Sequence, residues 1–228
     1  MWWQDLLHLF FPVLCPGCGD SLPSKHLSLC LSCTQLLPHT GFASLPDNPA
    51  ERLFYGRCRV DRAHAEFYFS KGRTVQRLIH RLKYKGDERA GIFLGRIIGS
   101  TLKESERFSG LDYLLPMPLF ASRQKERGYN QSAIICKGIQ EVLNIPIAEN
   151  NLVRIRATET QTKKDRSKRW LNVADSFSLK DPSQLRGARL LLVDDVITTG
   201  ATLEASCAAL QKANPAGINI AVAAIAAK

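Results

Sequence analysis

The sequence predicts an α/β fold built on a mostly parallel sheet, preceded by a small cysteine-rich module. Three observations lead to this prediction. Strand and helix patterns alternate from residue 111 onward, one strand candidate is apolar along nearly its whole length, and four cysteines stand in two close pairs before residue 34. Strands that are apolar throughout are typical of parallel sheets covered on both faces. A chain of 228 residues has room for one main domain and a small module.

The spacing of apolar residues defines each element in turn. The helix expected over 74–86 carries Arg77, Arg81 and Lys83 away from its apolar face, where a solvated surface is the simplest reading and phosphate contact the alternative. The predicted elements are a short helix with Trp3, Leu6, Leu7 and Phe10 on one face; a strand at 65–70; a helix at 74–86 with Val75, Leu78, Ile79 and Leu82 inward; a strand at 111–119; a helix at 130–144 capped by Asn130; a strand at 188–195; a helix at 202–213 with Leu203, Cys207 and Leu210 inward; and a strand at 218–226.

The apolar start of the chain does not have the pattern of an export signal. It lacks a basic leading region, and Asp5 and His8 interrupt the apolar run. No run reaches the length needed to span a membrane. The sequence therefore predicts a cytoplasmic protein whose cysteines are mostly reduced.

Cys15, Cys18, Cys30 and Cys33 form a C-x2-C-x11-C-x2-C pattern with turn-forming neighbours. Four thiolates in this spacing can bind Zn²⁺ tetrahedrally and form a closed, structural site. Two disulfides or a redox CxxC are the alternatives. Cys58, Cys136 and Cys207 are expected to be isolated, semi-buried residues. The turn-rich segment 38–50 is predicted as a linker, so that residues 1–45 form the zinc module and residues 51–228 the main domain.

The segment "RLLLVDDVITTGAT" at 189–202 carries the chemistry. Asp194 and Asp195 stand at the carboxyl end of the apolar strand, where open α/β sheets bind ligands. Carboxylates accept hydrogen bonds from sugar hydroxyls, while a helix N-terminus with a close-approaching glycine binds phosphate. Together they indicate a sugar phosphate. A receiver domain is excluded because no aspartate follows Asp195, and a ligand-free helix cap explains a single acid or threonine but not the whole set. The cradle residues are Thr198, Thr199, Gly200, Ala201 and Thr202.

The same segment resembles the signature of type I phosphoribosyltransferases, which bind 5-phosphoribosyl-1-pyrophosphate (PRPP). With "LLPMPL", "RQKERGYNQS", "RIRATETQ" and "RWLNVADSF" elsewhere, the chain resembles the ComF family of competence-associated proteins over nearly its whole length. This resemblance implies a type I phosphoribosyltransferase fold with a mostly parallel sheet, plus an N-terminal zinc-ribbon-like module.

The resemblance also implies roles for individual residues. The two aspartates would hold the ribose hydroxyls and the cradle the 5-phosphate, with Asp195 a candidate for assisting near the reaction centre. The pyrophosphate would face Pro118, Leu119 and Arg123. A lid at about 157–171 would supply Lys163, Lys164, Arg166 and Arg169. The family's RGxNQ segment corresponds to Arg127, Gly128, Tyr129, Asn130 and Gln131, where Gly128 provides the turn into the helix.

Two functions of different kinds follow. The first is transfer of phosphoribosyl from PRPP to an unidentified acceptor, with Mg²⁺ and cations stabilising the leaving pyrophosphate. The chain lacks an N-terminal cysteine nucleophile and the length for an amide-hydrolysing domain, so glutamine-dependent amination by this chain alone is not expected. The second is non-catalytic sensing of PRPP or a nucleotide, with single-stranded DNA or a competence helicase or recombination protein as partner. The net charge of +10 favours anionic ligands in both cases.

Overall fold

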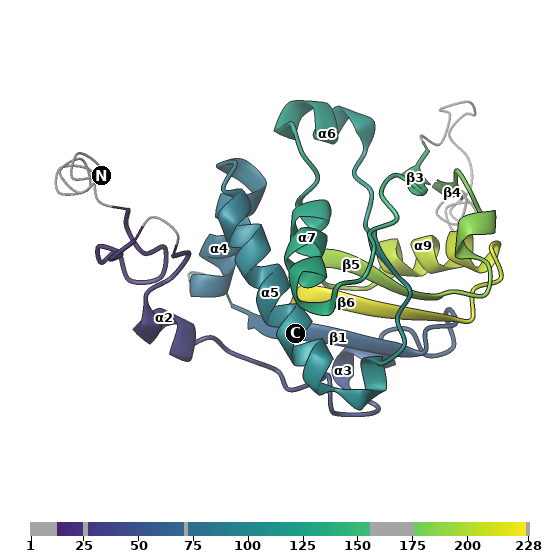
Figure 1. Ribbon diagram of the computed structural model, residues 1–228, viewed down its shortest axis with the longest axis horizontal. Helices are drawn as coiled ribbons and strands as arrows, with labels where there is room; N and C mark the ends of the chain where they lie inside the picture. Colours follow the sequence, from purple (N-terminus) through teal and green to yellow (C-terminus); the bar gives the residue numbers. More distant parts are fainter. Residues whose placement is uncertain (1–12, 25–26, 71–72, 156–175, 227–228) are drawn as a thin grey trace, which may run out of the picture.

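A computed structural model describes residues 13–24, 27–70, 73–155 and 176–226, and its centre is a four-stranded sheet in the order β1-β6-β5-β2 (Figure 1). All three strand pairs of this sheet are parallel, which confirms the predicted class. The strands span β1 Arg62–Phe69, β2 Tyr113–Pro116, β5 Arg189–Ile197 and β6 Gly217–Ala226. A separate antiparallel pair joins β3 Leu152–Arg154 to β4 Phe177–Leu179.

Helices cover both faces of the sheet. One face is packed by α4 Thr74–Tyr84, α5 Glu88–Glu104 and α7 Gln131–Leu143, and the other by α3 Pro49–Arg52 and α9 Ala201–Gln211. Successive residues of β5 divide between the two cores, since Leu191 and Val193 belong to the first and Leu190 and Leu192 to the second. This explains the near-continuous apolar run that marked the strand in the sequence.

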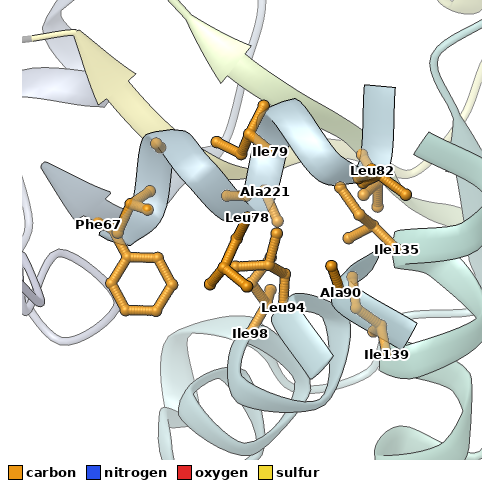
Figure 2. Close-up of a cluster of buried hydrophobic side chains, with 14 of the residues drawn as sticks. Phe67, Leu78, Ile79, Leu82, Ala90, Leu94, Ile98, Ile135, Ile139 and Ala221 are labelled. Atoms are coloured by element: carbon orange, nitrogen blue, oxygen red, sulfur yellow. The ribbon is translucent and has the colours of Figure 1, made fainter. Parts of the chain in front are cut away.

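The core on the α5 face is an interlocked cluster of aliphatic side chains (Figure 2). The apolar face predicted for the first long helix is confirmed, because all four of its inward residues are buried. The side chains that meet there are Leu78, Ile79 and Leu82 of α4, Ala90, Leu94 and Ile98 of α5, Ile135 and Ile139 of α7, and Phe67 and Ala221 of the sheet.

Helices α5 and α7 approach each other closely at two glycines. A Cβ atom on Gly95 would lie 2.1 Å from the Ile135 carbonyl oxygen, and one on Gly138 would lie 2.3 Å from that of Ile92. Neither distance leaves room for a side chain. The sequence analysis does not predict α5, and this packing accounts for the glycines that weaken its helical pattern.

Segment 38–50, predicted as a linker, is bonded to β1 and the loop before it. Thr40 N donates to the Glu66 carbonyl at 3.0 Å, and the fully buried Asn48 donates through Nδ2 to the Ala63 carbonyl at 3.0 Å. His39 Nδ1 lies 2.6 Å from Glu66 Oε1, while His64 Nε2 lies 2.8 Å from Oε2. Although burial acts to raise it, the two histidines lower the pKa of the Glu66 carboxyl group. This segment therefore has a defined path across the main domain.

The other elements predicted between residues 65 and 226 are found with somewhat different bounds, whereas the short helix predicted around Trp3, Leu6, Leu7 and Phe10 lies outside the described residues. Asn130 caps α7, because its Oδ1 accepts from Ser132 N at 3.0 Å. Strand β5 continues two residues beyond Asp195, to Ile197. A short helix that was not predicted, α6 Ala121–Arg127, follows the loop after β2 and ends at Gly128, whose φ of 81° is left-handed. The predicted turn at this glycine is thus confirmed.

Candidate functional site

The two aspartates of β5 are held by different helices. Asp194 Oδ1 accepts from Ser132 Oγ of α7 at 3.0 Å and from the Asp195 backbone N at 2.9 Å. Asp195 Oδ2 lies 2.9 Å from Lys83 Nζ of α4, without the alignment of a hydrogen bond. Asp195 is only 4% exposed. The acidic pair therefore sits between the ends of α4 and α7, at the carboxyl edge of the sheet.

Burial and the neighbouring carboxylate change the protonation of Asp194. Desolvation, followed by the negative charge of Asp195, raises the pKa of the Asp194 carboxyl group to about 7. The hydrogen bonds from Asp195 N and Ser132 act in the opposite direction and do not offset this. A carboxyl group with this pKa changes charge near neutral pH, which is typical of ligand-binding and catalytic sites.

The sequence analysis expected Lys83 to lie on a solvated face of the helix. The structure places it differently. The side chain is 23% exposed and points to Asp195. Helical periodicity correctly places Lys83 off the apolar face of α4, but it cannot show that the last turn of this helix reaches over the sheet edge. Tyr129 Oη donates to the Leu82 carbonyl and fixes that turn.

The predicted phosphate cradle forms the turn between β5 and α9. Thr198, Thr199, Ala201 and Thr202 are exposed there, and Gly200 begins the helix with a φ of 76°. The N-terminus of an eleven-residue helix suits an anion. These five residues thus lie three to seven positions beyond Asp195, on the same edge of the sheet as the acids.

Arg57, which the sequence analysis did not select, supports the cradle from outside. Its NH1 donates to the Thr199 carbonyl and to the Leu53 carbonyl, both at 2.9 Å, and its NH2 pairs with Glu204 in the first turn of α9. A carboxylate at that position would repel a bound phosphate. The guanidinium group neutralises it and fixes the direction of the Thr199 peptide.

The loop after β2 borders a cavity of about 450 Å³. Pro118 and Leu119 line this cavity, and both are half-buried, whereas Arg123 is exposed on α6. Arg154 of β3 also lines it, with its guanidinium carbon 3.7 Å from the centre of the Phe120 ring. Burial and then the nearby charge of Arg123 lower the pKa of Arg154. Arg154 thus adds a second cation beside the loop expected to face pyrophosphate, and no spacing pattern in the sequence indicated it.

The RGxNQ segment links this loop to the acidic pair. Asn130 Nδ2 donates to the Met117 carbonyl at 3.0 Å, and Arg127 NH1 donates to Gln131 Oε1 at 2.6 Å. Because Asn130 also caps the helix that carries Ser132, the segment sets the position of Asp194 indirectly. The predicted lid residues Lys163, Lys164, Arg166 and Arg169 lie outside the described residues.

The four N-terminal cysteines come together as predicted. The sulfur atoms of Cys15, Cys18, Cys30 and Cys33 all lie within 4.8 Å of one another, which suits a single metal ion. Burial acts to raise the pKa of the Cys15 thiol, but hydrogen bonds led by the Cys30 backbone lower it to about 6. The thiolate, the form that binds metal, is thus favoured at Cys15, whereas burial and hydrogen bonds within the metal-free cluster raise the pKa of Cys33 to about 11. Arg77 NH1 donates to the Gly17 carbonyl at 2.6 Å and attaches the module to α4.

Two of the other cysteines are not isolated. Cys58 and the fully buried Cys207 share a hydrogen bond, which lowers the pKa of the Cys58 thiol and, with burial, raises that of Cys207. Cys136 is completely buried in the α5 core, as an ordinary apolar residue would be.

Comparison with known proteins bears on the same region. The sequence profile of the phosphoribosyl transferase domain matches residues 138–228, which include both acids and the cradle. The DNA utilization protein YhgH of Salmonella typhimurium is 30% identical over 194 residues, covering 83% of this chain and 74% of that protein. Competence protein F of Haemophilus influenzae is 28% identical over 217 residues, covering 89% and 93%.

A solved structure is similar over a smaller share of its length. The glutamine PRPP amidotransferase of B. subtilis, complexed with ADP and GMP, gives a TM-score of 0.41 at 20% identity and covers 58% of this chain and 25% of that one. Within the part of the chain that the structure describes, no helix is both long and apolar enough to cross a membrane.

Proposed function

Because the chain belongs to the ComF family of phosphoribosyltransferase-domain proteins, which includes YhgH, we propose that it binds PRPP and transfers its phosphoribosyl group to an acceptor, releasing pyrophosphate. The observation that carries this proposal is the common edge of the sheet at which the acidic pair and the exposed start of α9 meet. Carboxylates for hydroxyls and backbone N–H groups for phosphate are what a pentose phosphate requires.

The proposed binding mode assigns one task to each part of the edge. The two aspartates orient the ribose hydroxyls, and Thr198–Thr202 hold the 5-phosphate, with Arg57 offsetting Glu204. Pro118, Leu119 and Arg123 face the pyrophosphate, and Arg154 adds positive charge beside them. This arrangement places cations where negative charge develops as pyrophosphate leaves, which is the largest contribution that such a site makes.

Mg²⁺ fits the same residues. Asp195 Oδ2 is a buried carboxylate oxygen that contacts the Lys83 ammonium group without an aligned hydrogen bond, and carboxylate oxygens suit Mg²⁺. When bound with PRPP, the ion would supply positive charge to the leaving group. Asp194 and Asp195 are the residues that would hold it. In this proposal the four cysteines hold a structural Zn²⁺, and the chain works in the reducing cytoplasm.

Isothermal titration with PRPP and Mg²⁺ tests the binding site. We expect binding by the wild type and at least a hundredfold weaker binding by the Asp194→Asn/Asp195→Asn variant. Asp112→Asn is the matched control, because this exposed aspartate precedes β2 at the opposite edge of the sheet. Absence of heat with the wild type would refute the proposed site. Pyrophosphate release with a panel of bases and amines then tests transfer, and tight binding without release would favour a sensor.

A second function, binding of single-stranded DNA, is favoured by a different surface. Tyr84 at the end of α4 is 67% exposed; its ring lies 4.9 Å from that of His80, and the Arg127 guanidinium lies 5.5 Å from its centre. Exposed aromatic rings among cations stack on bases without sequence preference. The other basic residues of this helix and its end are Arg73, Arg77, Arg81, Lys83 and Lys85.

Fluorescence anisotropy with a labelled oligonucleotide tests this second function. Phosphate contacts predict an affinity that falls steeply with salt, and base stacking predicts a loss of about 1–3 kcal/mol for Tyr84→Ala. Tyr55→Ala is the matched control, since Tyr55 is 58% exposed and lies elsewhere in the chain. Equal affinities of the two variants would exclude Tyr84 as a stacking platform. A competence helicase or recombination protein is a further partner that we propose from the resemblance to the ComF family.

A further inference from the structure

The basic residues of α4 have different partners. Arg77 donates to the backbone of the cysteine module, and Arg81 pairs with Asp87 at 2.7 Å. Lys83 alone of these three contacts the acidic pair. Lys85, two residues further on, is exposed. The last turn of α4 and the residue after the helix thus supply one lysine that contacts the site and one that is exposed to solvent.

Lys83 is held in place by its surroundings. Leu82, its neighbour, is completely buried, and the Leu82 carbonyl accepts the hydroxyl of Tyr129. The Lys83 side chain is 23% exposed and the Asp195 side chain 6% exposed, so the contact is shielded from solvent chiefly on the carboxylate side. Desolvation opposes such a pair, and the attraction of the two charges offsets part of that cost.

The position of Lys83 has a consequence for divalent cations. Among the described residues, Asp194 accepts from two neutral donors, the Ser132 hydroxyl and a backbone N–H, whereas Asp195 Oδ2 faces the lysine ammonium group at 2.9 Å. A lysine ammonium group is a compact point charge. At that distance its positive charge opposes the approach of a metal ion to Asp195 Oδ2.

We propose that Lys83 is a positioning residue that serves as the built-in counter-cation of Asp195, so that a divalent cation enters the acidic pair only together with its phosphorylated ligand and in exchange for the ammonium group. This inference rests on the proposed function for the identity of that ligand, PRPP. In the free protein the lysine keeps the pair neutralised and excludes the metal. When the ligand and its cation arrive, the ammonium group is released toward the phosphates.

Mn²⁺ binding to the zinc-loaded full chain tests the proposal, with free Mn²⁺ measured by its EPR signal. Without PRPP, we expect weak binding by the wild type and more than tenfold tighter binding by Lys83→Met, which keeps the aliphatic stem. Lys83→Arg keeps the charge and should behave as the wild type does. Lys85→Met is the matched control and should not change binding. The gain should disappear in the Lys83→Met/Asp195→Asn variant.

Two results would overturn the proposal: equal Mn²⁺ affinities of wild type and Lys83→Met, or a gain of the same size in Lys85→Met. Circular dichroism of each variant shows whether it is folded. If Lys83→Met does not fold, Lys83→Arg still tests the proposal, because tighter Mn²⁺ binding by Lys83→Arg than by the wild type would contradict the proposal. A titration of wild type with PRPP and Mn²⁺ separates this inference from the proposed function. Absence of PRPP binding would refute the function while leaving the Mn²⁺ gain of Lys83→Met to be judged independently.

Discussion

Replacement of Asp194 by asparagine should make the protein more stable at neutral and alkaline pH. The ordinary pKa of an aspartate, 3.8, is raised to about 7 by desolvation and the charge of Asp195. Between these pH values the native state holds a proton that the unfolded state has released, so the free energy of unfolding falls as pH rises. The loss is complete above about pH 7 and absent below about pH 4.

The size of the effect follows from the difference between the two pKa values. Each pKa unit corresponds to about 1.36 kcal/mol, so the ionised Asp194 destabilises the native state by up to about 4 kcal/mol. Asparagine removes the titrating group and retains an oxygen that accepts from Ser132 Oγ and Asp195 N. We therefore expect a gain that approaches this value at pH 8 and vanishes toward pH 4.

Urea unfolding at several pH values between 4.5 and 8.5 measures this gain. The wild type should lose stability across the range, and Asp194→Asn should lose less. Asp181→Asn is the control, because hydrogen bonds led by that of the Ser183 hydroxyl lower the pKa of Asp181, so its replacement should bring no gain at any pH. If Asp194→Asn were no more stable than the wild type at pH 8, the conclusion that the acidic pair is retained at a cost in stability would be wrong. Residues that destabilise a fold in this way are found where ligands use them.

Three further predictions concern other parts of the molecule. Arg57→Ala should weaken PRPP binding, measured by calorimetry, about tenfold, or about 1.4 kcal/mol, because the charge of Glu204 is then no longer neutralised. Arg52→Ala, which removes an exposed ion pair, should leave PRPP binding unchanged. Gly138→Ala should lower the free energy of unfolding in urea by about 1–3 kcal/mol, because its Cβ would lie 2.3 Å from the Ile92 carbonyl oxygen. Cys30→Ser should reduce the zinc content measured with a colorimetric chelator, while Cys136→Ser, outside the cluster, should keep it.

The periodicity of apolar residues predicts most helices and strands of the main domain, because it reflects which side chains are buried. The apolar run of β5, the inward face of α4 and the Asn130 cap of α7 are all local patterns with a direct structural meaning. Helix α5 was missed since Gly91, Gly95 and Gly99 lower helix propensity, and only the approach of α7 reveals why they are there. A pattern within one helix cannot show that a glycine is needed for close contact with a second helix.

The same distinction applies to the site. The acids and the cradle are contiguous in sequence, so a motif can identify them, whereas Ser132, Arg154, Lys83 and Arg57 reach the site from four other elements or loops. Ser132 and Arg154 lie in segments that resemble the ComF family, and phosphate contact was the alternative for Lys83, but no sequence pattern showed which groups these side chains contact. Residues that contact a motif from distant parts of the chain are therefore the hardest part of a site to identify from sequence.

The origin of these partners has a consequence for how the domain works. Residues 138–228, which match the phosphoribosyl transferase profile, supply the two aspartates, the cradle and Glu204; Arg154 and Lys180 of the same range line the neighbouring cavity, and the predicted lid cations lie outside the described residues. Lys83 and Arg57, which neutralise Asp195 and Glu204, both come from the chain before the profile begins. A site for a polyanionic ligand needs these positive charges as much as it needs the motif. In the proposed binding mode the N-terminal part of the main domain therefore contributes to the site, and variants there should change ligand affinity without altering the signature.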